Sequence, residues 1–156
     1  MSDSSIIISA FADEDRRLRS LVESLSPDQQ IATCEDGLCV RALLCHVSAW
    51  DQAVIKFFVE KVEGNITSHT PHSFTELEEQ TKHREAELLN KSFSEIYAQY
   101  IETTSKMQNF ILTNWDELSE EDHNYFTIPL QHRRHHRHKL EKVLNISEEM
   151  ENAITA

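Results

Sequence analysis

The sequence predicts an all-α protein, a four-helix bundle, and three observations support this fold class. Glycine and proline are scarce, with 2 Gly and 3 Pro in 156 residues, whereas β-sandwiches and barrels need turn residues about every 8–12 positions. Apolar residues recur every three or four positions along four long stretches, which is the spacing of one helix face. The length suits one domain, so we expect residues 1–156 to form a single bundle.

The first two long helices are expected over residues 4–25 and from about Asp36 to Glu63. Ser26-Pro27 ends the first helix and permits a restart, because proline cannot continue a helix but begins one well. Gly64-Asn65 closes the second helix. The predicted inner faces of the two helices consist of Ile7, Phe11, Leu18, Leu21, Val22 and Leu25, and of Cys39, Leu43, His46, Trp50, Ala53 and Phe57.

A shorter helix is expected over residues 73–90, in the connection between the second and third long helices. It is very polar and should lie across the outside of the bundle. Ser92 and Glu95 form a capping box that opens the third long helix, which runs to about Trp115. The inner residues of that helix are Phe93, Tyr97, Tyr100, Thr104, Met107 and Ile111.

The last long helix is expected from about Pro129 to Asn145, after an acidic loop over residues 116–122. Residues 147–156 should form a frayed or disordered tail. About 27 residues separate the second and third long helices. A crossover of that length, with its extra short helix, lets neighbouring helices run in the same direction, so we predict an up-down-down-up topology.

The chain is strongly acidic, with a formal net charge of −12 and a sequence pI near 5.1. This charge disfavours nucleic acid and anionic membranes as partners. No apolar run approaches the roughly 18 residues of a membrane span, and no secretory signal is recognisable. Cys34, Cys39 and Cys45 have neither CxxC nor zinc-knuckle spacing, so reduced thiols in a cytoplasmic protein are expected.

Three histidines occupy positions where core leucines would be expected. His132 and His136 stand four residues apart on the apolar face of the last helix, between Ile128 and Leu140, and His46 lies on the apolar face of the second helix. Residues four apart on a helix have Cβ atoms roughly 5–6 Å apart, so both rings can reach one metal ion. His46 would complete three nitrogens if it came from a facing helix.

The register of the two helices permits this arrangement. His46 lies about ten residues from the start of its helix and His136 about nine from the end of its own. At roughly 1.5 Å per residue, both are near 15 Å from those ends, so antiparallel helices would bring the three histidines to one level. Spacing alone leaves open a core without metal, although buried unpaired imidazoles would each cost roughly 1–3 kcal/mol.

Residues 131–139 form a run rich in histidine and arginine. Arg133, Arg134, Arg137 and Lys139 place a local charge of +4 on the acidic chain. The run could dock a phosphate-bearing or acidic partner, or it could be a solvated face that pairs with the chain's own carboxylates. Its histidines His135 and His138 fall on the polar side of the helix and are weaker ligand candidates.

Other reactive side chains are weaker candidates for a catalytic or metal site. Cys45 and His46 could suggest a nucleophilic pair, but adjacent helical residues point about 100° apart. His69 and His72 share a short predicted loop without further ligands and are expected to be exposed.

Several segments resemble the DinB-like superfamily. Leu43 to Asp51, LLCHVSAWD, is similar to a histidine-containing segment on that family's second helix, and His132 to Arg137, HRRHHR, is similar to its H-x-x-x-H segment on the last helix. Trp115 to Asp122 and Ser24 to Gln29 resemble its loops before the last and second helices. The resemblance implies a four-helix bundle that binds a divalent metal through three histidines, which here are His46, His132 and His136.

The resemblance also implies a class of chemistry, because such proteins include thiol-dependent transferases and isomerases and hydrolytic or detoxifying enzymes. We therefore predict a metal-dependent enzyme that acts on a small molecule, with Trp50 lining the pocket and no catalytic base identifiable. The ion would be Zn, Ni, Fe or Mn, since all accept nitrogen ligands, and a low-molecular-weight thiol is a possible cosubstrate. The sequence leaves the oligomeric state open, with a homodimer as one option. The alternative is a non-catalytic helical interaction module whose basic strip, residues 131–139, docks a partner.

Overall fold

The computed structural model describes residues 4–31, 39–65 and 76–155. Within these ranges the chain is almost entirely helical, which confirms the all-α prediction. Cys34, His69 and His72, on which part of the sequence analysis falls, lie outside the described residues.

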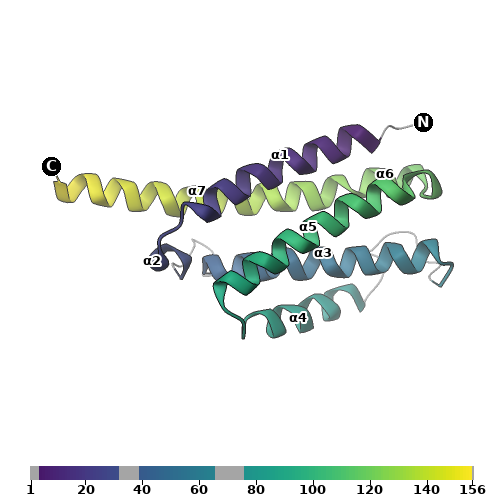
Figure 1. The fold of residues 1–156 in the computed structure, drawn as a ribbon, viewed down its shortest axis with the longest axis horizontal. Helices are drawn as coiled ribbons and strands as arrows, with labels where there is room; N and C mark the ends of the chain where they lie inside the picture. The colour runs from purple at the N-terminus through teal and green to yellow at the C-terminus, as the bar shows by residue number, and fades with distance from the viewer. Residues whose placement is uncertain (1–3, 32–38, 66–75, 156) are drawn as a thin grey trace.

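Four long helices form the bundle: α1 (Ser4–Glu23), α3 (Val40–Val62), α5 (Phe93–Asn114) and α7 (Thr127–Thr155). α1 and α7 run in one direction and α3 and α5 in the other, which is the predicted up-down-down-up topology (Figure 1). α4 (Glu76–Leu88) belongs to the long crossover and packs against α3, on the outside of the bundle (Figure 1). Because α3 and α7 are antiparallel and in contact, they can present residues to each other at one level.

The helix ends follow the local sequence where capping residues are present. The restart after α1 is the short helix α2 (Pro27–Gln30), which Ser26 and Gln29 open with a capping box. The predicted capping box of Ser92 and Glu95 opens α5. Gly64 follows α3 with a φ of 82°, a left-handed conformation that glycine adopts without steric cost.

Two segments differ from the prediction: the start of α3 and the stretch before α7. α3 begins at Val40, with Cys39 as its N-cap, rather than near Asp36, which the structure does not describe. The segment predicted as an acidic loop contains a 3₁₀ turn, η2 (Trp115–Glu117), and the short helix α6 (Glu120–Tyr125). The reason is a capping box that the sequence analysis missed: Ser119 caps α6 and Asp122 bonds back to the Ser119 backbone.

α7 is longer than predicted at both ends. It begins at Thr127, because Pro129 then lies in the first turn, where backbone N–H groups have no intrahelical partner to lose. Its backbone is helical through Thr155, where a frayed tail was expected from residue 147. No glycine or proline follows Pro129, so nothing in that stretch forces the helix to stop.

In the described part of the chain, the buried apolar residues form two clusters, one toward each end of the bundle. One cluster lies near α2 and includes Leu18, Leu43 and Tyr100. The other lies near α6 and includes Phe57, Phe58 and Phe126. α3 supplies residues to both clusters. It is long and apolar enough to cross a membrane by length and composition alone, but 61% of its most apolar window is buried inside the bundle. Most of its apolar surface is therefore used in the core.

Candidate metal centre

The three predicted ligands come together between α3 and α7. Nε2 of His132 lies 3.0 Å from Nε2 of His46 and 2.9 Å from Nε2 of His136. One ligand atom from each of the three rings falls within 4.8 Å of the other two. The i, i+4 spacing brings the two α7 rings to a centroid separation of 4.5 Å, and His46 faces them from the antiparallel helix, with centroids at 4.9 and 5.3 Å.

The donor set suits a divalent cation better than it suits hydrogen bonding. Nε2 of His132 contacts two other Nε2 atoms, but a ring nitrogen has one proton or one lone pair and cannot satisfy both neighbours. Three lone pairs directed at one ion remove that conflict. For metal–nitrogen bonds of about 2.0–2.1 Å, tetrahedral geometry separates the nitrogens by about 3.3–3.4 Å, and the two separations at His132, 3.0 and 2.9 Å, lie within a few tenths of an ångström of that value.

The environment keeps the two α7 imidazoles in the neutral form that binds metal. Burial, helped by the neighbouring His46 ring, lowers the pKa of His132 to about 3. Burial and the adjacent His132 ring likewise lower the pKa of His136 to about 3. A histidine must be neutral to donate a nitrogen to an ion, and these two rings stay neutral well below physiological pH.

The centre is partly open to solvent. His136 is buried, but 32% of the His46 side chain is exposed, and His132 is intermediate in exposure. The ring of Trp50 lies beside His132, with centroids 4.9 Å apart, so the predicted pocket residue does border the centre. Two of the three candidate ligands are therefore not fully buried, unlike those of a closed structural site.

One residue at the centre was not predicted. Nδ1 of His46 is hydrogen-bonded to Oε1 of Glu85, which α4 supplies from the crossover. α4 was expected to be a polar helix on the outside of the bundle, and no site residue was predicted on it. Glu85 shares one face of α4 with Thr81 and Leu88, at i, i+4 and i+7, and both of these residues are buried, but this face is not set apart by apolar residues in the sequence.

A buried ion pair lies next to the histidines and was also missed. Nη2 of Arg133 lies 2.6 Å from Oδ2 of Asp51, and both side chains are almost completely inaccessible to solvent. Arg133 also donates to Thr104 Oγ1 and lies over the ring of Phe11. Because Asp51 is on α3 and Arg133 follows His132 on α7, the pair joins the two helices that carry the histidines.

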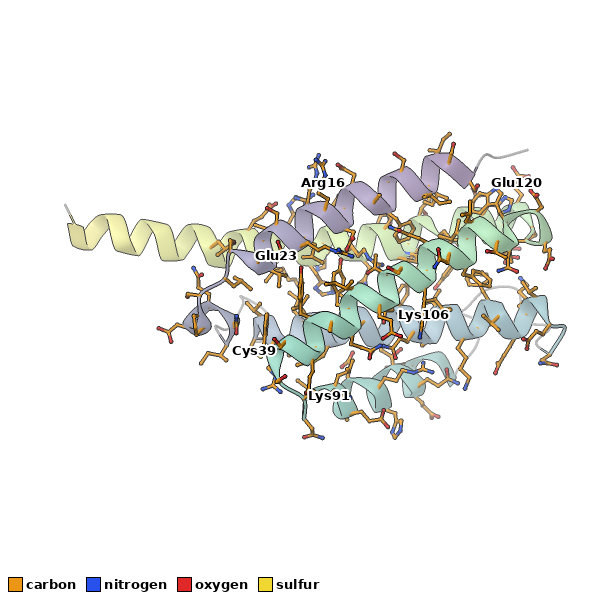
Figure 2. All side chains as sticks on the ribbon, in the orientation of Figure 1. Arg16, Glu23, Cys39, Lys91, Lys106 and Glu120 are labelled. Atoms are coloured by element: carbon orange, nitrogen blue, oxygen red, sulfur yellow. The ribbon has the colours of Figure 1, made fainter. Side chains whose placement is uncertain are left out.

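The remaining arginines of the basic strip are also engaged within the chain. Glu14 of α1 is buried and accepts hydrogen bonds from Arg134 and from Arg137, which is itself buried and also pairs with Glu141. By contrast, Arg16 points away from the bundle (Figure 2) and pairs with Asp13 of the same helix. The strip does pair with the chain's own carboxylates, but the expectation of a solvated face is wrong for Arg133 and Arg137.

Cys45 does not form a catalytic pair with His46. Its thiol is buried, and burial raises its pKa to about 11, so almost no thiolate exists at neutral pH. A thiol in this state is a poor nucleophile. Cys39 and Cys45 are both free thiols in the described part of the chain.

Comparison with known proteins adds no family assignment: no family model matches the chain, and no curated protein or solved structure is detectably similar to it. The resemblance to the DinB-like superfamily therefore stays a prediction from short motifs. What the structure itself contributes is an all-α bundle in which three histidines from two helices lie close enough together to hold a metal ion.

Proposed function

We propose that this protein is a metal-dependent enzyme acting on a small molecule, of the thiol-dependent transferase or hydrolase type. The observation that carries the proposal is the convergence of His46, His132 and His136, with ligand atoms within 4.8 Å of one another in a partly exposed position. Three neutral nitrogen ligands leave a divalent ion its full charge and an open coordination position, which is the pattern of catalytic rather than structural sites.

The chain's residues have distinct tasks in this proposal. The three imidazoles bind the ion, and their burial keeps two of them unprotonated. The ring of Trp50, which lies beside His132, would offer an apolar surface to a substrate. A divalent ion held there would polarise a substrate carbonyl and acidify a bound water or thiol toward neutral pH. The donor set accepts Zn, Ni, Fe or Mn.

The compartment and cosubstrate follow from the same chemistry. A low-molecular-weight thiol would bind the open position as a thiolate, the form that coordinates metal. Such thiols are kept reduced in the cytoplasm, where free cysteines such as Cys39 and Cys45 also persist. We therefore propose that the protein is cytoplasmic.

Metal content is the first test. We expect wild-type protein, prepared without a histidine tag, to carry close to one divalent ion per chain by elemental analysis. His46→Ala, His132→Ala and His136→Ala should each lose nearly all of it, because two imidazoles seldom hold an ion. His135→Ala is the matched control, since its side chain is exposed and lies on the same helix. Wild-type protein that neither contains nor takes up a divalent ion would refute the proposal.

Activity is the second test. Metal-loaded and chelator-treated protein should be compared in a screen for conjugation of small thiols to electrophiles and for hydrolysis of activated esters and amides. Turnover that appears only with metal, and disappears in His46→Ala, identifies the reaction class. Turnover that survives chelation would assign the activity to another part of the molecule.

A further inference from the structure

The three histidines of the metal centre are not held alike. Nδ1 of His46 has a carboxylate partner, Glu85, which stands 39 positions away on α4. The Nδ1 atoms of His132 and His136 are buried and make no hydrogen bond within the described part of the chain. The rings on α7 are therefore oriented by packing, whereas the orientation of His46 depends on a residue of the crossover helix.

Glu85 lies at the far edge of the His46 ring from the centre. Its Oε1 atom is hydrogen-bonded to Nδ1, while Nε2 of the same ring faces His132 at 3.0 Å. A carboxylate at Nδ1 favours the tautomer in which Nδ1 carries the proton, which leaves the lone pair on Nε2. An effect of Glu85 on the candidate ligand atom, Nε2, would therefore pass through the ring.

The structure holds Glu85 in place through the packing of α4 on α3. Thr81 and Leu88, on the same face of α4, are buried, and Arg41 of α3 donates hydrogen bonds to the carbonyls of Leu89 and Lys91 just beyond the end of α4. Glu85 is 28% exposed, compared with 78% for Glu78 and 63% for Glu87 of the same helix. Among these three carboxylates, it alone faces the bundle.

We propose that Glu85 is a positioning residue that fixes the tautomer and orientation of His46 for metal binding. α4 would then contribute to the metal centre through this residue. The proposal rests on the proposed function, since it assigns Glu85 a role at the same site. Outer carboxylates that hold a ligating histidine raise its basicity and typically change metal affinity or activity by about 10–100-fold when removed.

The test compares Glu85 with a neighbour on the same helix. Glu85→Ala should weaken binding of Zn²⁺ or Ni²⁺ by about 10–100-fold in a competition titration with a chelator of known affinity. Glu85→Gln, which keeps an acceptor atom but not the charge, should fall between Glu85→Ala and wild type. Glu87→Ala, which removes an exposed carboxylate, should bind as wild type does. Equal affinity of wild type and Glu85→Ala would overturn the proposal.

A second measurement separates positioning from structural damage. In metal-free wild type, ¹⁵N NMR of the histidine rings should show His46 protonated at Nδ1, and Glu85→Ala should shift it toward the tautomer protonated at Nε2. Helicity and the unfolding midpoint should change little, because Glu85 is partly exposed. If wild type binds no metal, the proposed function fails, and the NMR result then decides by itself whether Glu85 sets the His46 tautomer. An unchanged tautomer in Glu85→Ala would refute that role.

Discussion

Replacing Arg133 by methionine is expected to lower the free energy of unfolding by about 3–5 kcal/mol at pH 8, the usual cost of leaving one member of a buried ion pair alone. Arg133 is one of the largest fully buried side chains in the described part of the protein, and its partner Asp51 is completely inaccessible to solvent. Methionine fills most of the space, so the loss reports on the uncompensated carboxylate rather than on a cavity. Urea unfolding of chelator-treated protein, followed by circular dichroism, measures it.

The loss should depend on pH with a definite sign. Burial raises the pKa of Asp51 to about 6 even though the Arg133 guanidinium opposes the shift, as does His46 on the same helix. When the pKa of a carboxyl group is raised in the folded state, the free energy of unfolding decreases as pH rises from the unfolded-state pKa to the folded-state pKa. In wild type this loss is complete near pH 6. Without Arg133 the pKa of Asp51 in the folded state is higher still. The difference in free energy of unfolding between wild type and Arg133→Met should therefore increase above pH 6.

Two further variants make the interpretation secure. Asp51→Leu combined with Arg133→Met removes both charges and should recover much of the loss, because apolar pairs often replace buried ion pairs without penalty. Glu78→Gln, in an exposed pair with Lys82, should leave the midpoint almost unchanged. A deficit of Arg133→Met that is equal at pH 5 and pH 8 would show that Asp51 is not what Arg133 compensates.

The helices were predictable because burial imposes a period that the sequence displays. Phe11, Leu18 and Val22 repeat at helical spacing on one face and are buried in α1. The ends were predictable only where a capping residue was noticed. Ser92 and Glu95 were noticed, whereas Ser119 and Asp122, with the same spacing and bonding, were not. Negative charge alone had suggested a loop there, although acidic residues also favour a helix N-terminus.

The ligands were predictable for a different reason, which is that histidine is out of place on an apolar face. His132 and His136 stand where leucine would pack, so their spacing carried information. Arg133 and Arg137 have the same i, i+4 spacing and also point inward, but they belong to a continuous basic run and were grouped with it. Glu85 was hidden because α4 carries many acidic residues, and only the three-dimensional packing shows which of them faces His46.

Replacing His136 by leucine is expected to separate metal binding from stability. If the histidines are ligands, the variant should lose the stabilisation that metal provides, which is about 2.7 kcal/mol when free metal is 100 times its Kd. Without metal, the variant should be at least as stable as wild type, because leucine fills the buried position without a polar atom that lacks a hydrogen bond. If the histidines instead complete a polar core, leucine should destabilise the protein with or without metal.

Lowering the pH should enlarge the difference in stability between metal-free His136→Leu and wild type. The pKa of His136 is about 3 in the folded protein, against an ordinary value of 6.5, because burial disfavours the charged ring. A histidine with a lowered pKa contributes stability that is present above pH 6.5 and is lost as pH falls, since only the unfolded chain takes up the proton. At pH 5 this amounts to about 2 kcal/mol for one ring. Metal-free His136→Leu should therefore exceed wild type in stability by more at pH 5 than at pH 8, as measured by urea unfolding at both pH values. A variant that is less stable at both would identify His136 as a structural residue and would remove the main support for the catalytic proposal.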